Sequence, residues 1–235
     1  MPVKELLLTN PKISSEEVLK AIAVAIPSET ITTAIEDTQA QRQRQRMLPT
    51  HLVVALIIAM SLWSTYSIED VLQNLVQGLS GQWIRLSQRW KKPSKSSISE
   101  ARQRIGPQVM SRLFHLVARP LGSEQTPGVF LNGLRLMAVD GTGLDLPDTD
   151  ENARVFGYPG TRAGTEASFP KARLVILVEA GTHLITDALL SHYRMGERGR
   201  ALKVLRSVGP GMLLMWDRGL HSFKMVKAIQ DRGSH

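Results

Sequence analysis

The chain of 235 residues is long enough for one large hydrophobic core or two smaller ones, and its hydrophobic content of 43% is that of a globular protein, which excludes a disordered one. It contains no cysteine, which excludes disulfides and thiolate zinc sites and suits a reducing cytoplasm. The longest apolar run, residues 52–60, is far shorter than the roughly 20 residues that a membrane-spanning helix needs.

The net charge of +8 is concentrated in one stretch of the chain, because residues 41–120 carry 12 Lys/Arg against 3 Asp/Glu. So large a basic excess favours a polyanionic partner. The alternative is a solvated basic face that maintains solubility. The side chains that we single out as candidates for contacts with DNA are Arg42, Arg44, Arg46, Lys91, Lys92, Lys95, Arg102 and Arg104.

Residues 1–120 are predicted to form a mostly helical N-terminal domain. Three segments place a serine three positions before an acidic residue, the spacing of a capping box at a helix start, namely Ser14–Glu17, Ser67–Asp70 and Ser97–Glu100. A fourth helix is expected to open at Pro49 and to run through Trp63. Because its residues are apolar nearly all round, we expect it at the centre of the N-terminal core.

A basic, serine-rich connector is predicted over residues 83–97. Pro93 disfavours helix at the residue before it, so the next helix is expected to begin at Ser97. Arg102 and Arg104 would then lie in the N-terminal half of that helix, where the helix dipole also attracts phosphate. The pattern resembles a helix-turn-helix that reads the major groove. Any two helices joined by a basic turn would give the same pattern.

The second half of the chain changes to short β-forming runs. Strands are predicted at Leu134–Val139, Arg173–Val178, His183–Leu190 and Met212–Trp216, with a hairpin turn at Gly181–Thr182 and helices at Glu197–Val208 and Ser222–Ile229. Three strands, a helix, a fourth strand and a helix is the element order of a ribonuclease H-like fold. We therefore predict an α+β chain with a helical N-terminal domain followed by a ribonuclease H-like domain.

Asp140 and Asp217 each close an apolar run, the first and the fourth of the predicted strands. A carboxylate at the mouth of a buried strand is held rigidly and meets solvent, as a magnesium site for phosphoryl chemistry requires. Each residue also has a structural interpretation. Asp140 before Gly141 suits a turn, and Asp217 before Arg218 suits an ion pair at a helix start.

Other polar residues compete for a functional role. The acidic run 145–150 resembles a calcium loop but lacks its glycine and closing glutamate, so a polar turn is preferred. Glu197 could complete an acidic triad, although a favourable charge at a helix N-terminus is the simpler interpretation. Lys171 and Arg173 are further candidates for contact with the DNA backbone. The six histidines show no close ligand spacing, so no zinc is assigned.

Four segments in the same order resemble the DDE transposases of the insertion-sequence-four type. They are Leu48–Pro49 before an apolar helix, Ser97–Gly106, Val139–Thr142 and Trp216–Gly219. The resemblance covers the chain from about Gln39 onward. It implies metal-dependent cleavage of transposon ends and strand transfer into target DNA. Asp140 and Asp217 occupy the family's first two acidic positions and would be the catalytic and metal-binding residues for Mg²⁺, or alternatively Mn²⁺.

The family's third acidic residue, a glutamate in a Tyr-Arg-Glu-Lys signature, has no counterpart in this sequence. The resemblance therefore implies that residues 129–235 form a truncated catalytic domain and that this chain alone is inactive. The implied partners are double-stranded DNA, as transposon ends and target, and a second copy or a full-length transposase in the bacterial cytoplasm near the nucleoid. The alternative is a non-catalytic DNA-binding protein that occupies transposon ends or inhibits a full-length transposase. A nuclease that uses only two acids is a second alternative.

Overall fold

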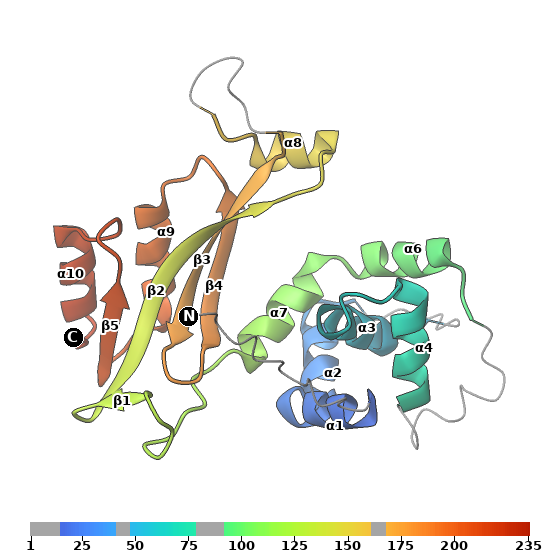
Figure 1. Cartoon of the computed structure of the whole chain (residues 1–235), viewed down its shortest axis with the longest axis horizontal. Helices are drawn as coiled ribbons and strands as arrows, with labels where there is room; N and C mark the ends of the chain where they lie inside the picture. The colour runs from blue at the N-terminus through green and yellow to red at the C-terminus, as the bar shows by residue number, and fades with distance from the viewer. Residues whose placement is uncertain (1–14, 41–47, 79–91, 161–167) are drawn as a thin grey trace, which may run out of the picture. The chain divides into compact units, whose positions relative to one another are not determined.

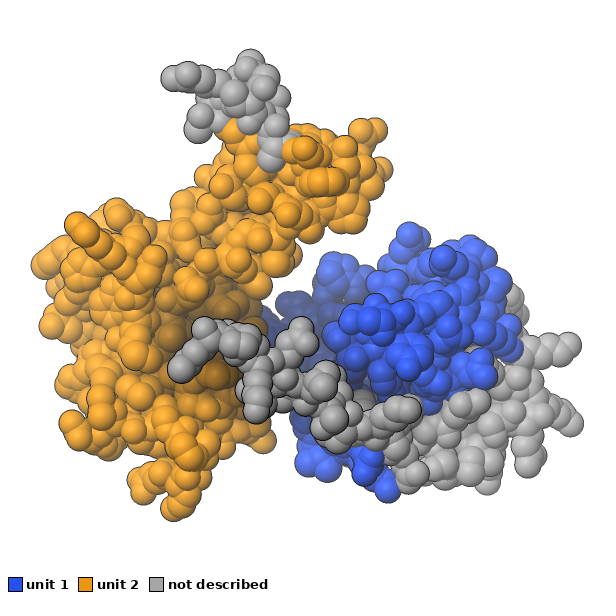
Figure 2. All heavy atoms as spheres, in the orientation of Figure 1, with its two compact units in different colours: residues 1–117 blue, residues 118–235 orange. Residues whose placement is uncertain are grey.

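The computed structural model describes residues 15–40, 48–78, 92–160 and 168–235 (Figure 1). They belong to two compact units, residues 1–117 and 118–235, which Figure 2 colours separately. Within the described ranges no helix combines the length and the apolar character that crossing a membrane requires.

The described part of the first unit is helical, as predicted. Its helices are α1 (Ser15–Ala25), α2 (Ser28–Asp37), α3 (Thr50–Leu62), α4 (Ile68–Gly78), α6 (Lys95–Ile105) and α7 (Pro107–Val117). Helix α3 lies at the centre of this unit. Its Leu56 packs in one apolar cluster with residues of α1, α4 and α6, while its Val54 packs in a second cluster with residues of α2 and α7. Each fully buried leucine contributes about 1.5–3 kcal/mol to stability.

Local hydrogen bonds explain where these helices begin. Ser67 caps α4, since its Oγ accepts a hydrogen bond from the Asp70 N–H (3.2 Å) and donates one to the Asp70 carboxylate (2.7 Å). This predicted helix start is confirmed. The predicted start at Ser97 is wrong, because Ser94 follows Pro93 and its hydroxyl accepts from the Ser97 N–H (3.3 Å), so α6 already begins at Lys95.

The second unit is a mixed sheet with helices, so the prediction of an α+β chain holds. Its strands are β1 (Phe130–Leu131), β2 (Leu134–Asp145), β3 (Lys171–Glu179), β4 (Leu184–His192) and β5 (Met212–Trp216). Its helices are α8 (Asp150–Phe156), α9 (Glu197–Val204), which continues as a short 3-10 turn (Leu205–Ser207), and α10 (Phe223–Gln230). Strands β2, β3 and β4 form an antiparallel meander, and β5 pairs in parallel with β2.

Helices α9 and α10 cover one face of this sheet. Side chains alternate along a strand, so Met137 and Val139 of β2 point into the core beneath these helices together with Leu214 of β5. Ala201 of α9 and Met225 of α10 complete this core from the helix side. The intervening residues of β2 and β5 therefore lie on the opposite face of the sheet.

Glu179 closes β3 as a fully buried carboxylate. It accepts hydrogen bonds from the backbone N–H groups of Leu121 and Gly122 and from the Thr182 hydroxyl, and it pairs with Arg135. Burial alone would raise the pKa of Glu179, but these hydrogen bonds outweigh burial and lower its pKa below the usual value. The charged carboxylate thus links Leu121 and Gly122, near the start of the second unit, to the end of β3.

Candidate active site

The sheet brings Asp140 and Asp217 together. In the parallel β2–β5 ladder Val139 pairs with Trp216, and each aspartate is the next residue along its chain. Neighbouring strands lie about 4.8 Å apart, so the two aspartates occupy adjacent positions at the end of this ladder. Both are exposed.

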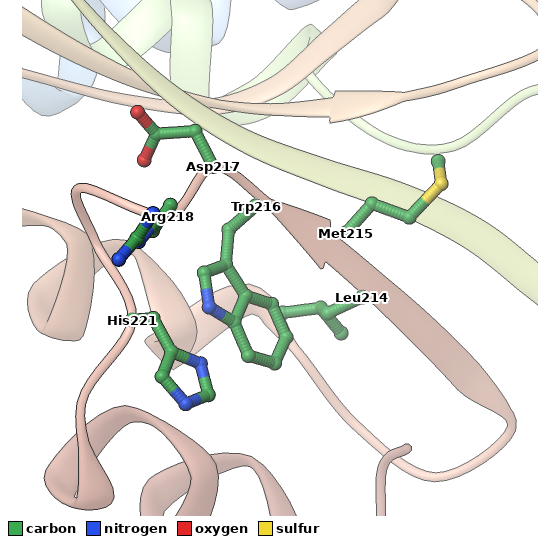
Figure 3. Close-up of a pocket in the computed structure, with 6 residues that line it drawn as sticks. All are labelled: Leu214, Met215, Trp216, Asp217, Arg218 and His221. Atoms are coloured by element: carbon green, nitrogen blue, oxygen red, sulfur yellow. The ribbon is translucent and has the colours of Figure 1, made fainter.

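The two carboxylates also share a face of the sheet. Val139 and Leu214 point into the core under α9 and α10, so by alternation Asp140 and Asp217 point to the opposite face. Figure 3 agrees for Asp217, whose carboxylate points away from the Trp216 ring. The sheet therefore presents two exposed carboxylates from neighbouring strands on its face away from α9 and α10.

Asp140 does not end its strand, and this corrects the sequence-based prediction. Strand β2 continues to Asp145 because residues Gly141–Asp145 keep pairing with Lys171–Val175 of β3 after β5 has ended. The interpretation of Asp140 as a turn residue is therefore wrong. Asp217, by contrast, does follow the last residue of its strand, as predicted.

Each aspartate is oriented by a local hydrogen bond. The Gly141 N–H donates to Asp140 Oδ1 (2.7 Å), and the Leu220 N–H donates to Asp217 Oδ1 (2.9 Å). Helix α10 is capped by Ser222 rather than by Asp217, so the predicted helix-start role of Asp217 is wrong. Among the described residues no hydrogen bond engages Oδ2 of either aspartate, so one oxygen of each is available to a cation.

Glu197 does not join this pair. It lies on the α9 side of the sheet, where a side chain at Gly141 would overlap its carboxylate, whereas Asp140 lies on the other side. Glu197 instead pairs with Arg173 (2.9 Å). Across the described ranges no three His, Asp or Glu side chains are grouped so that they could hold a metal ion.

An open pocket of about 490 Å³ lies beside Asp217, lined by Leu214, Met215, Trp216, Asp217, Arg218 and His221 (Figure 3). The rings of Trp216 and His221 stack there with centroids 6.2 Å apart. This pocket adjoins β5, whose backbone also exchanges hydrogen bonds with His235 through Met212 and Leu214. Sequence reasoning did not anticipate the pairing of Trp216 with His221, for which their five-residue spacing was the only signal.

The basic candidates for DNA contact lie only partly within the described residues. Arg42, Arg44, Arg46 and Lys91 fall outside them. Lys95 is the first residue of α6, but Arg102 and Arg104 lie in its last turn and not in its N-terminal half as predicted, because α6 begins earlier than expected. At a helix C-terminus a cation complements the dipole, so the expected helix contribution to phosphate binding does not apply to these two residues.

The exposed basic side chains of this region differ in whether they form an ion pair. Arg104 pairs with Glu100 (3.5 Å), and Lys92 lies 3.9 Å from Asp70. Within the described part of the chain, Lys95 and Arg102 form no ion pair. Exposed pairs of this kind contribute little to stability, so Lys92 and Arg104 can exchange their partners for phosphate.

Lys171 and Arg173 are engaged within the sheet domain. Lys171 pairs with Asp145 (3.1 Å), and Arg173 both binds Glu197 and donates to the Tyr193 carbonyl oxygen (3.3 Å). The acidic run 145–150 is divided between the end of β2 and the start of α8, which Thr149 caps by accepting from the Asn152 N–H (3.2 Å). This run forms a connection between two elements.

The known proteins to which this chain is similar are transposases. Residues 16–115 match the family model of the insertion element 4 transposase N-terminal region. The chain is 28% identical over 217 residues to the transposase InsG for insertion sequence element IS4 of Escherichia coli K12, across 92% of this chain and 47% of InsG. It is 25% identical over 209 residues to the putative transposase InsZ of the same strain, across 88% of this chain and 66% of InsZ.

These matches support an assignment of the chain to the insertion element 4 transposases. The chain spans about half the length of InsG and about two thirds of InsZ. No solved structure matches it.

Proposed function

We propose that this chain supplies two of the three acidic residues of a DDE active site, which cleaves transposon ends and joins them to target DNA. The observation that carries the proposal is the placement of Asp140 and Asp217 beside one another on the same face of the sheet. The sheet order β4–β3–β2–β5, in which β5 runs parallel to β2 while the short β1 pairs antiparallel with β2, resembles that of a ribonuclease H-like domain and supports the same proposal.

The donor set suits Mg²⁺ or Mn²⁺. Both ions prefer carboxylate oxygens, and Mg²⁺ keeps several of its own water molecules, so it needs few protein ligands. Asp140 and Asp217 would each offer Oδ2, while the N–H groups of Gly141 and Leu220 hold Oδ1 and fix the orientation of the carboxylates. When bound, such ions activate water or a 3′-hydroxyl and stabilise the leaving oxygen.

We further propose that these 235 residues do not cleave DNA by themselves. The described residues group no third carboxylate with Asp140 and Asp217, and Glu197 lies across the sheet from them. The reaction would need a third carboxylate that this arrangement does not supply.

A second candidate function does not need a third carboxylate. A protein that binds transposon ends without cutting them, and so inhibits a full-length transposase, needs the basic helical unit but not a complete acidic triad. The match of residues 16–115 to the N-terminal family model and the exposed cations of α6 support this candidate. It predicts that added chain slows end cleavage by a full-length family member, whereas an inert chain would leave that rate unchanged.

Metal binding tests the assignment of the two aspartates. Titration with Mn²⁺, followed by electron paramagnetic resonance, should show weak binding to the chain and none to Asp140→Asn or Asp217→Asn. Asp231→Asn is the matched control, since Asp231 is an exposed aspartate at the end of α10. Unchanged affinity in the double Asp140→Asn, Asp217→Asn variant would rule out this site.

A further inference from the structure

The first turn of α9 contacts both of the backbone segments that carry the aspartates. Glu197, the first residue of α9, lies against Gly141, the residue after Asp140. Arg198, the next residue, donates a hydrogen bond from Nε to the Gly219 carbonyl oxygen (2.7 Å), two residues after Asp217. Two consecutive side chains of one helix thus meet the interior of β2 and the turn that follows β5, which are far apart in the sequence.

The contact at Gly141 leaves no room for a side chain while Glu197 stays in place. A Cβ at Gly141 would overlap the Glu197 carboxylate, which would then have to move. Glu197 is fixed in turn by Arg173, whose Nη1 donates to Oε2 (2.9 Å) and whose guanidinium lies over the Tyr193 ring (4.9 Å to its centroid). Both partners of this pair are largely shielded from solvent, with side chains 19% and 32% exposed.

The contact at Gly219 supports the turn that orients Asp217. Residues 217–220 form this turn, in which the Leu220 N–H donates to Asp217 Oδ1 (2.9 Å) and, more weakly, to the Asp217 carbonyl oxygen (3.3 Å). The Arg198 guanidinium holds the Gly219 carbonyl from the α9 side. Without it, the hydrogen bonds that the described residues give the turn beyond β5 would all be local ones.

We propose that Glu197 and Arg198 are positioning residues that set the separation of Asp140 and Asp217 from the opposite face of the sheet. The inference rests on the proposed two-aspartate metal site and explains how that site stays in place although both carboxylates are exposed. Removal of a group that orients a metal ligand typically lowers metal affinity by about 10–100-fold.

The test compares variants of the full chain by Mn²⁺ titration and by residue-resolved amide exchange without metal. Arg198→Ala should lower Mn²⁺ affinity by about 10-fold and speed exchange of the Leu220 amide, and Glu197→Gln should lower the affinity while keeping its side-chain volume. Lys203→Ala is the matched control, because Lys203 is an exposed cation in the last turn of the same helix. Thermal midpoints should match the wild type, which separates positioning from a loss of folding.

The outcomes are distinct. Wild-type affinity and wild-type Leu220 exchange in Arg198→Ala would overturn the positioning role of Arg198, and wild-type affinity in Glu197→Gln would overturn that of Glu197. If Arg198→Ala fails to fold, Arg198→Met removes the hydrogen-bond donor but keeps an extended side chain, and an unchanged affinity there would count against the proposal. If the wild-type chain binds no Mn²⁺, the metal site itself fails, and Leu220 exchange still decides whether Arg198 holds the turn.

Discussion

The Arg206 guanidinium donates two hydrogen bonds of 2.8 Å to the Asp187 carboxylate, one to each oxygen. Asp187 lies in β4 and is 1% exposed, and it also accepts from the Ser207 hydroxyl (2.6 Å) and from the Ala188 N–H (2.7 Å). This pair joins β4 to the turn that follows α9. The hydrogen bonds keep the buried carboxylate charged.

The Asp187 pair predicts an acid-sensitive contribution to stability. Burial alone would raise the pKa of Asp187, but the hydrogen bonds from Arg206, Ser207 and Ala188 outweigh it and lower the pKa below its usual value. A group whose pKa is lower in the folded state stabilises the fold above its unfolded pKa of about 3.9, and this stabilisation is lost as the pH falls through the folded pKa. Asp187→Asn should therefore lower the free energy of unfolding by about 2 kcal/mol at neutral pH.

Denaturant titrations of wild type and Asp187→Asn at several pH values check this prediction. The difference between the two proteins should be constant near neutrality and shrink below about pH 4. Asp231→Asn, which changes an exposed aspartate, should show no such difference. A gap that stays constant into strong acid would contradict the role of the charged carboxylate.

The basic helical unit predicts salt-sensitive DNA binding. The full chain should bind duplex DNA with an affinity that falls steeply as salt concentration rises, because released counterions drive the association. Charge reversal at Arg102 and Arg104 should weaken binding and lower the slope of log affinity against log salt by about 1 for each lost phosphate contact. Fluorescence anisotropy with a labelled duplex measures both quantities.

Charge reversal at Lys224 and Lys227 provides the control for DNA binding, since both are exposed cations of α10 in the other unit. These changes alter the net charge by the same amount as the α6 changes. If both pairs weaken binding equally, the effect belongs to net charge and the assignment to α6 is wrong.

Periodicity and turn chemistry predicted most elements of the sheet domain because each strand carries its own signal. The Gly181–Thr182 turn lies between two β-forming runs, and Met212–Trp216 is a short apolar run after glycine and proline. The continuation of β2 to Asp145 was missed because Gly141 and Gly143 disfavour a strand locally. There the pairing with β3 overrides propensity.

The candidate site was predictable only in part. Asp140 and Asp217 could be selected because each follows an apolar run, and the parallel pairing of β2 with β5 then determines their proximity. The contacts of Glu197 with Gly141 and of Arg198 with Gly219 could not be predicted from the local sequence, because they depend on where α9 crosses the sheet. The start of α6 was ambiguous for a different reason, because Ser94 and Ser97 are both competent caps and only the backbone hydrogen bond to Ser94 decides between them.

The last prediction is that this chain alone does not nick DNA that carries transposon ends, even with Mn²⁺. In-line displacement by two metals requires ions held about 3.5–4 Å apart, and two aspartates leave one ion loosely held. Since a misplacement of about 1 Å can cost roughly 100-fold in rate, the loss of a whole ligand should cost more. A supercoiled plasmid with the element's ends should therefore stay uncut within the detection limit of a gel. Cleavage that disappears in Asp217→Ala but persists in Asp231→Asn would show that another residue of this chain completes the site.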